Sequence, residues 1–399
     1  MTAPFLISAD PAPLASTASQ AITRTRMLAI DALRGLVMLF MLVDHVRETF
    51  FLHVQVSDPM DPTTVAPELF FTRVTSMVCA PVFVFLTGLS AWLYGQTHTP
   101  AQTSGFLFKR GLFLVVLELT LVNFCWNATS VPTTLWLQVI WAIGLCMIIL
   151  AGLIHLPRAA LAGIAVVLIA GHNLLDGIVL TPDSAFFGIW SVLHQRSFIE
   201  LTEHTRLRTT YPILPWIGVI ALGYVIGPWF ARQATPAERI KRLLITGAAL
   251  LAGFVVLRYL NVYGDKPWVA MQDTTHTLMS FLSLTKYPPS LLFLLPTLGV
   301  GLLLLAGFER LGQARPLQTL ALFGGAPMFF YLLHLAVLKA AYLVAVQLWG
   351  LNQGAYYGFD HLYGIWAWAV LLSAALYLPT RWFARLKQQR RDIAWLKYF

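Results

Sequence analysis

Apolar residues fill about ten stretches of roughly 17 to 25 residues each, with short polar segments between them. A stretch of this length crosses the hydrocarbon core of a bilayer as a helix, because each backbone polar group in lipid must find its partner within the segment. The pattern therefore predicts an all-α fold, a polytopic transmembrane helical bundle. The predicted spans are 27–48, 69–94, 107–125, 133–154, 159–179, 211–230, 242–262, 288–307, 326–348 and 362–380.

The composition supports this class: hydrophobic residues make up 58% of the chain, charged residues only 11%, and the mean hydropathy is +0.70. Residues 1–23 are rich in Ala, Pro, Ser and Thr, which predicts a disordered tail and not a cleavable signal peptide. Residues 24–386 form a single predicted transmembrane domain. Residues 387–399 are a predicted basic cytoplasmic tail.

Lysine and arginine gather in alternate short segments between the spans. Under the positive-inside rule, this alternation with an even number of spans places both termini in the cytoplasm. The net charge of +9 then comes mostly from basic residues that orient the protein in the membrane. No basic soluble domain is present that would bind nucleic acid. The basic positions are Arg24, Arg26, Lys109, Arg110, Arg158, Arg232, Arg239, Lys241, Arg242, Arg310, Arg315, Arg381, Arg385, Lys387, Arg390, Arg391 and Lys397.

Cysteine and histidine positions predict no metal site. Cys79, Cys125 and Cys146 lie in apolar stretches without paired spacing, so we interpret them as small buried side chains. The histidines fall on different spans and loops, without the close pairs expected of zinc ligands. No internal repeat relates the two halves of the chain, which weakens a transporter interpretation.

The first predicted span carries Asp31, Arg34 and His45 within an apolar sequence. At about 100° per helical residue, Arg34 and His45 lie within roughly 20° of one face, and Asp31 lies about 40° from His45. Ionisable residues are costly in lipid, so by default they face other helices or a watery cavity. This stripe is the leading candidate for an active site. The alternatives are a structural ion pair of Asp31 with Arg34 and an interfacial His45.

The predicted outer loops are rich in polar and aromatic residues. The segment Glu48–Glu68 holds His53, Asp58, Asp61 and Glu68. The segment Thr181–Thr210 holds His194, Arg196, Glu200, Glu203, His204, Arg206 and Arg208, and Gly264–Pro288 holds Asp265, Lys266, Trp268, Asp273, His276 and Lys286. Together they predict a mouth for a hydrophilic, sugar-like acceptor. Ordinary solvated loops would have the same composition, and that alternative stays open.

The string IDALRG at Ile30–Gly35, followed by His45, resembles the first helix of membrane-bound acyltransferases. Two related groups share it: acyltransferase family 3 and the group named for heparan-α-glucosaminide N-acetyltransferase. A bacterial branch of the second group is similar to this sequence over nearly the whole chain. The strings that carry this similarity are CAPVFVFLTG (79–88), PWIGVIALGY (215–224), TKYPPSL (285–291) and APMFFYLLHL (326–335).

The resemblance implies an enzyme that transfers an acyl group, usually acetyl, from cytoplasmic acetyl-CoA to an extracytoplasmic carbohydrate hydroxyl or amine. Acetyl-CoA would be the donor substrate, and no metal would be required. The expected partners are the lipid bilayer and a carbohydrate or glycolipid acceptor, and the expected location is a bacterial inner membrane. A transporter or flippase of a lipid-linked or small anionic solute, and a non-catalytic scaffold, are the alternatives.

The resemblance also implies which histidine reacts. In family 3 the histidine at the position of His45 is the presumed base, whereas the glucosaminide enzyme places its essential histidine in the following loop, where His53 is the nearest match. Both His45 and His53 are therefore candidate catalytic residues. The alternative for His53 is a plain loop residue.

Helix geometry assigns roles to the rest of the first span. Arg34 and His45 are about 16 Å apart along a helix, comparable to the reach of a phosphopantetheine arm. Arg34 can hold a CoA phosphate, and Asp31 can orient Arg34. Asp44 and Arg47 are candidate substrate-binding residues. Asp44 points about 100° away from His45, so we do not predict a helical dyad.

Four residues outside the first span are also candidate substrate-binding residues. Lys286 and Tyr287 lie at the predicted start of the eighth span, and Tyr331 and His334 lie in a later span. For Tyr331 and His334, hydrogen bonding between helices is an equally good explanation.

Overall fold

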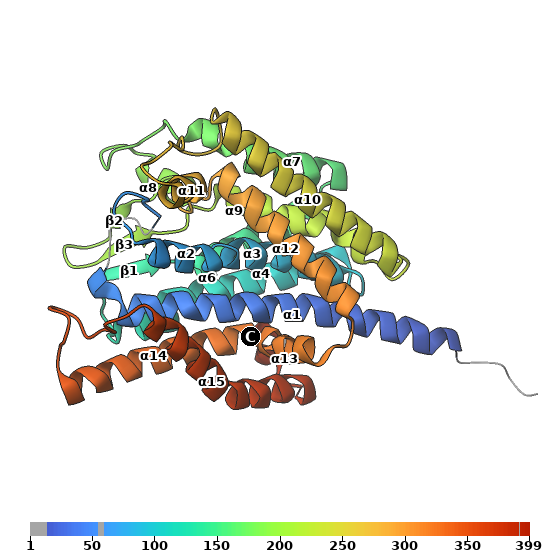
Figure 1. Cartoon of the computed structure of the whole chain (residues 1–399). Helices are drawn as coiled ribbons and strands as arrows, with labels where there is room; N and C mark the ends of the chain where they lie inside the picture. The colour runs from blue at the N-terminus through green and yellow to red at the C-terminus, as the bar shows by residue number, and fades with distance from the viewer. Residues whose placement is uncertain (1–13, 55–59, 391) are drawn as a thin grey trace, which may run out of the picture.

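A computed structural model describes residues 14–54, 60–390 and 392–399 (Figure 1). The long helix α1 (Leu14–Phe50) runs across the middle of the bundle, where it packs against α3, α12, α13, α14 and α15. A small β-sheet, α8 and α11 lie on the side of the bundle where α1 ends. The other helices are α2 (Pro67–Ser76), α3 (Cys79–Gly95), α4 (Pro100–Leu117), α5 (Asn123–Asn127), α6 (Val139–Leu153), α7 (Arg158–Gly171), α8 (Phe187–Leu193), α9 (Leu214–Val225), α10 (Pro236–Leu260), α11 (Thr274–Leu282), α12 (Leu291–Leu311), α13 (Arg315–Gly325), α14 (Pro327–Trp349) and α15 (Tyr363–Gln389).

Short helical segments of other types extend these helices. Among them, η2 (Glu118–Val122) is a π-helical turn that joins α4 to α5. Its Glu118 carboxylate accepts a hydrogen bond of 3.1 Å from the backbone N–H of Trp141 in the first turn of α6. The 3₁₀ segments are η1 (Leu52–Val54), η3 (His172–Leu175), η4 (Gly227–Phe230) and η5 (Ala394–Tyr398).

Every predicted span contains a helix, but fewer of these helices are of membrane-spanning length. Within the described residues, six helices are long and apolar enough to cross a membrane by length and composition. The helices α6 and α9 are apolar but have only 15 and 12 residues. The count of ten spans and the cytoplasmic position of both termini therefore stay predictions. The six are Pro67–Gly95, Arg158–Leu175, Pro236–Leu260, Leu291–Leu311, Pro327–Trp349 and Tyr363–Gln389.

The fold is nearly all-α, but the all-α prediction was incomplete, because three short segments form a sheet in the order β1-β3-β2. Strand β1 (Thr134–Leu137) runs parallel to β3 (Arg206–Thr209), and β2 (Phe198–Glu200) runs antiparallel to it. The prediction placed the residues of β1 in a helical span. The residues of β1 are extended because the side chain of Asn123 hydrogen-bonds both backbone groups of Trp136. Its Oδ1 accepts from the N–H at 2.8 Å, and its Nδ2 donates to the C=O at 3.1 Å.

The predicted tails also differ from the structure where it describes them. Helix α1 begins at Leu14, inside the predicted disordered tail 1–23, whereas residues 1–13 lie outside the described residues. At the other end, Leu396 is only 2% exposed, and the ring of Tyr398 lies 5.8 Å from that of Phe113 in α4. Leu396 and Tyr398 of the predicted basic tail therefore pack against the bundle, whereas Trp395 is exposed.

Paired glycines let the helix backbones approach closely. A Cβ atom at Gly324 of α13 would lie 1.8 Å from the carbonyl oxygen of Asp31, and one at Gly35 of α1 would lie 1.8 Å from that of Leu320. Such small residues are typical of helix crossings in membranes, where packing replaces the hydrophobic driving force. The same reciprocal arrangement occurs at Gly88 with Gly223, Gly111 with Gly144, and Gly247 with Gly299.

We predict that Gly324→Ala lowers the thermal unfolding midpoint of the detergent-solubilised protein. The added methyl group would force α1 and α13 apart, and overpacking of this kind costs about 1–3 kcal/mol. Gly325→Ala is the matched control, since a Cβ atom there meets nothing within 4 Å. Equal unfolding midpoints for the two variants would contradict this role of the glycine pair.

Candidate active site

Two cavities lie along α1, one beside each half of its polar stripe. The larger has a volume of about 670 Å³ and is enclosed mainly by α1, α3, α4, α6, α14 and α15. The smaller has a volume of about 40 Å³ and lies further toward the C-terminal end of α1. Asp31 and Arg34 line the larger cavity, whereas Asp44 and His45 line the smaller one.

The two cavities share one wall. Met41, Phe83, Val139 and Tyr331 line both of them, and the side chains come from α1, α3, α6 and α14. These side chains therefore lie between the two spaces. Tyr331 is 2% exposed, so its hydroxyl lies deep in the bundle.

Arg34 is held in the larger cavity by two partners. Its guanidinium donates to the Asp31 carboxylate at 2.7 Å and to the hydroxyl of Ser90 on α3. The i, i+3 spacing of Asp31 and Arg34 on one helix allows the first contact. Arg34 therefore has a fixed position on the cavity wall, and its side chain is still 19% exposed.

Three further cations line the same cavity. Arg110 of α4, Lys387 of α15 and Arg232 join Arg34 there. The buried Nε of Arg110 has no hydrogen-bond partner among the described residues, and Lys387 reaches only a backbone carbonyl, that of Gly325, at 3.4 Å. From the sequence we assigned these cations to the basic residues that orient the protein in the membrane. No local sequence pattern shows that α4 and α15 pack close to α1.

Two histidines meet beside the smaller cavity. Nδ1 of His45 lies 2.7 Å from Nε2 of His334, and Nδ1 of His334 lies 2.7 Å from the carbonyl oxygen of Phe330. A carbonyl oxygen only accepts, so Nδ1 of a neutral His334 carries its proton and its Nε2 accepts. His45 then donates through Nδ1, which leaves the lone pair on its Nε2 free. The structure thus makes His334 a partner of His45.

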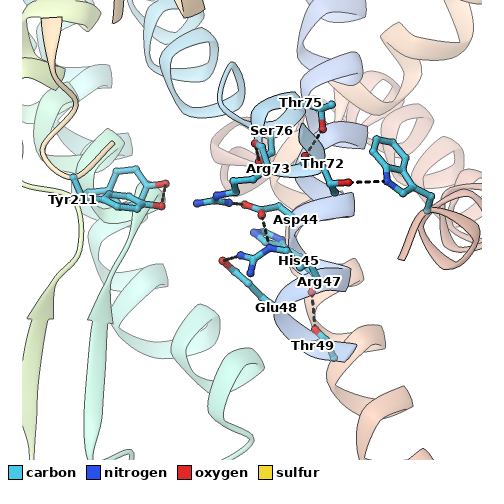
Figure 2. Close-up of polar contacts among 12 residues, drawn as sticks. Asp44, His45, Arg47, Glu48, Thr49, Thr72, Arg73, Thr75, Ser76 and Tyr211 are labelled. Carbon is cyan, nitrogen blue, oxygen red and sulfur yellow. Dashed lines mark hydrogen bonds and ion pairs between the residues drawn. The ribbon is translucent and has the colours of Figure 1, made fainter. Parts of the chain in front are cut away.

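Asp44 anchors a network of charges next to His45. Arg73 of α2 donates to one carboxylate oxygen of Asp44, and Arg47 donates to the other at 3.2 Å. Arg47 also donates to Glu48 at 3.1 Å. Figure 2 shows Asp44 between Arg73 and Arg47. Arg47 therefore lies in an ion-pair network and not on a cavity wall, and Arg73 is a member that we did not identify from the sequence.

Lys286 and Tyr287 reach the smaller cavity from the loop before α12. The hydroxyl of Tyr287 lies 3.5 Å from that of Tyr211, which also lines this cavity. Asp265 holds the loop by accepting hydrogen bonds from Thr285 at 2.7 and 2.8 Å and from Ser290 at 2.5 Å.

His53 lies apart from both cavities. Its ring packs 4.9 Å from that of Phe51, and its Nδ1 lies against Gly358, where an added Cβ would come within 2.5 Å. The structure therefore brings His45, but not His53, together with the other candidate residues. No hydrogen-bond partner for the buried Nδ1 of His53 is found among the described residues.

A family model described as heparan-alpha-glucosaminide N-acetyltransferase, catalytic, matches residues 26–263, more than half of the chain. The chain belongs to this family. The match confirms the family predicted from the sequence, and with the apolar helices it makes the chain an integral membrane acyltransferase. A comparison with curated proteins finds no match.

The family match includes one part of the site and leaves out another. Asp31, Arg34 and His45 lie within it, whereas Lys286 and the α14 residues lie beyond it. For this member of the acetyltransferase family, the partners of His45 and the loop at the smaller cavity therefore rest on the geometry of this chain.

The loop that carries Lys286 depends on one buried arginine. Arg258 of α10 is 1% exposed and donates to the carbonyl oxygens of Phe281, Lys266, Ser280 and Ser283 at 2.7–3.0 Å. A methionine at this position would leave these carbonyls without their donor. Each unsatisfied buried group costs about 1–3 kcal/mol.

We therefore predict that Arg258→Met lowers the unfolding midpoint and exposes the loop 264–288 to limited proteolysis. Arg242→Met is the matched control, because Arg242 is an exposed arginine of the same helix. Unchanged proteolysis of Arg258→Met would show that the loop is held by other contacts.

Proposed function

We propose that this chain transfers an acetyl group from cytoplasmic acetyl-CoA to a hydroxyl or amine of an extracytoplasmic carbohydrate. The observation that carries the proposal is the pair of cavities along α1 that share one wall beside His45. A donor in one cavity and an acceptor in the other would meet at this wall. The expected location is a bacterial inner membrane.

The larger cavity suits the donor. Its volume of about 670 Å³ is within the usual range for cofactor and ligand sites. Arg34, Arg110 and Lys387 provide positive charge that one carboxylate, Asp31, does not balance. Guanidinium groups bind phosphates by paired, charge-assisted hydrogen bonds, so these residues would hold the phosphates of CoA. Asp31 would orient Arg34.

The distance from Arg34 to His45 suits the length of the pantetheine arm of CoA. Arg34 and His45 are about 16 Å apart along α1, and Met38 and Met41 line the cavity between them. A pantetheine arm extended along these side chains would bring its thioester to the wall of Met41, Phe83 and Val139.

His45 would act as the general base. Its free Nε2 takes the proton from the acceptor hydroxyl or amine, whose oxygen or nitrogen attacks the thioester carbonyl carbon. The carbon–sulfur bond then breaks, and the proton on His45 passes to the leaving CoA thiolate. His334 would keep the lone pair of His45 on Nε2 through its own bond to the Phe330 carbonyl.

The smaller cavity would receive the reacting group of the acceptor. Asp44, Glu48, Lys286 and Tyr287 line it, which provides donors and acceptors for sugar hydroxyls. Its volume of about 40 Å³ leaves room for one hydroxyl or amino group and not for a whole sugar ring. The ring would lie outside it, toward the outer loops.

For the donor site, we predict that Arg34→Ala and Arg110→Ala each weaken acetyl-CoA binding about tenfold or more, since hydrogen bonds to charged groups contribute about 1.5–3 kcal/mol. Calorimetry on the detergent-solubilised protein measures this affinity. Lys109→Ala is the control, because Lys109 is an exposed neighbour of Arg110. A well-folded wild type that binds no acetyl-CoA would contradict the proposal and favour a transporter.

For the chemical step, we predict that His45→Ala lowers acetyl transfer by about 10²–10⁴-fold and leaves acetyl-CoA affinity unchanged. His334→Phe should lower the maximal rate less severely, because His45 keeps its ring and loses only its orienting partner. Transfer of radiolabelled acetyl groups to glucosamine measures both variants. Full activity of His45→Ala would exclude it as the base, and His53→Ala would then be the next variant.

A further inference from the structure

Three arginines gather on the outer sheet and the loop beside it, and we call Arg196, Arg206 and Arg208 the arginine cluster. The Cζ atoms of Arg206 and Arg208 lie 4.1 and 4.2 Å from the ring centre of Phe198 on β2. The Cζ of Arg196 lies 5.0 Å from the ring centre of Tyr287. Aromatic faces therefore hold each guanidinium in place.

No acid forms an ion pair with the arginine cluster within the part of the chain that the structure describes. None of its guanidinium nitrogens lies within 4.0 Å of a carboxylate oxygen there, although Glu200 is the cross-strand partner of Arg206. Among the described residues, the guanidinium groups of the cluster make one hydrogen bond, from Arg206 Nε to the hydroxyl of Thr134 at 3.3 Å. Burial, together with the charges of Arg196 and Arg206, lowers the pKa of Arg208. The fold thus holds like charges close together, which is electrostatically unfavourable.

The arginine cluster continues into the smaller cavity. Tyr287 carries Arg196 on its ring and also lines that cavity. Lys286, which lines it too, places its Nζ 5.3 Å from the centre of the same ring. Asp44 is bound by Arg73 and Arg47, and Glu48 is bound by Arg47, so among the described residues neither acid forms an ion pair with Lys286. A line of positive charge therefore leads from the sheet toward His45.

The position of the arginine cluster runs against the charge bias of membrane proteins. Arginines concentrate in cytoplasmic loops, and the predicted topology places the sheet on the opposite side. Three arginines on the outer side do not help topology, because the positive-inside rule counts Lys and Arg and gives Asp and Glu little weight. A role in binding explains why they lie there.

We infer that the arginine cluster binds an anionic group, a phosphate or a carboxylate, on the acceptor, so that the acceptor is an anionic sugar and not a neutral one. This inference rests on the proposed function. Arginine forks match the planar or tetrahedral oxygens of such groups. With the anion on the cluster, a hydroxyl or amino group of the same sugar reaches past Tyr287 into the smaller cavity, where His45 lies.

The test compares glucosamine with glucosamine 6-phosphate and glucosamine 1-phosphate, by calorimetry on the full chain in phosphatidylcholine nanodiscs. Wild type should bind at least one of the phosphates about tenfold or more tightly than glucosamine. Arg196→Gln and Arg208→Gln should remove this preference and leave glucosamine affinity unchanged. Lys266→Gln is the control, an exposed cation of another outer loop.

Equal binding of all three sugars, or binding of none, would overturn the inference. A second arm adds phosphatidylglycerol to the nanodiscs: if the glutamine variants lose retention of this lipid but keep the sugar phosphate preference, the anion is a headgroup and the inference fails. Acetyl-CoA binding is measured on the same samples. Its absence would overturn the proposed function without altering the sugar comparison, so the two failures are distinguishable.

Discussion

The close approach of helix backbones at paired glycines is the constraint on which the rest of the structure depends. At the crossing of α1 with α13, Gly324 contacts the backbone carbonyl of Asp31, one turn from Arg34. The crossing therefore fixes the inner half of α1, and with it the residues that line the larger cavity. Contacts with α14 place His334 beside the outer half in the same way. Close backbone packing and polar contacts between helices, such as Arg34 with Ser90 and His45 with His334, together set the geometry.

The charges of the bundle fall into two classes. Arg239 with Glu309, and Asp44 with Arg73, are buried ion pairs. Arg110 and the arginine cluster, in contrast, have no acid partner among the described residues. Buried or crowded charge without a partner is unfavourable, so these cations mark where anionic ligands fit. Arg110 lies beside the middle of α1, and the sheet with the arginine cluster lies toward its C-terminal end, as the proposed donor and acceptor sites require.

Sequence periodicity predicted the helices and the stripe on α1, because both depend on residues near one another in the chain. It predicted the contact of Asp31 with Arg34 for the same reason. The sheet was missed, since β1 pairs with β3 across more than sixty residues and carries no local signal. Arg73 and Arg110 were missed as site residues because only the packing of helices brings them to α1. His45 with His334 joins two residues 289 positions apart, which no spacing rule reveals.

We propose that the acyl group crosses between two cavities that open toward opposite sides of the membrane. Proteoliposomes with labelled acetyl-CoA outside and glucosamine, or its phosphate, trapped inside test it most directly. For molecules inserted with the basic ends of their helices facing outward, labelled acceptor should accumulate inside while the CoA released stays outside. Transfer that occurs only when donor and acceptor share one compartment would contradict the claim.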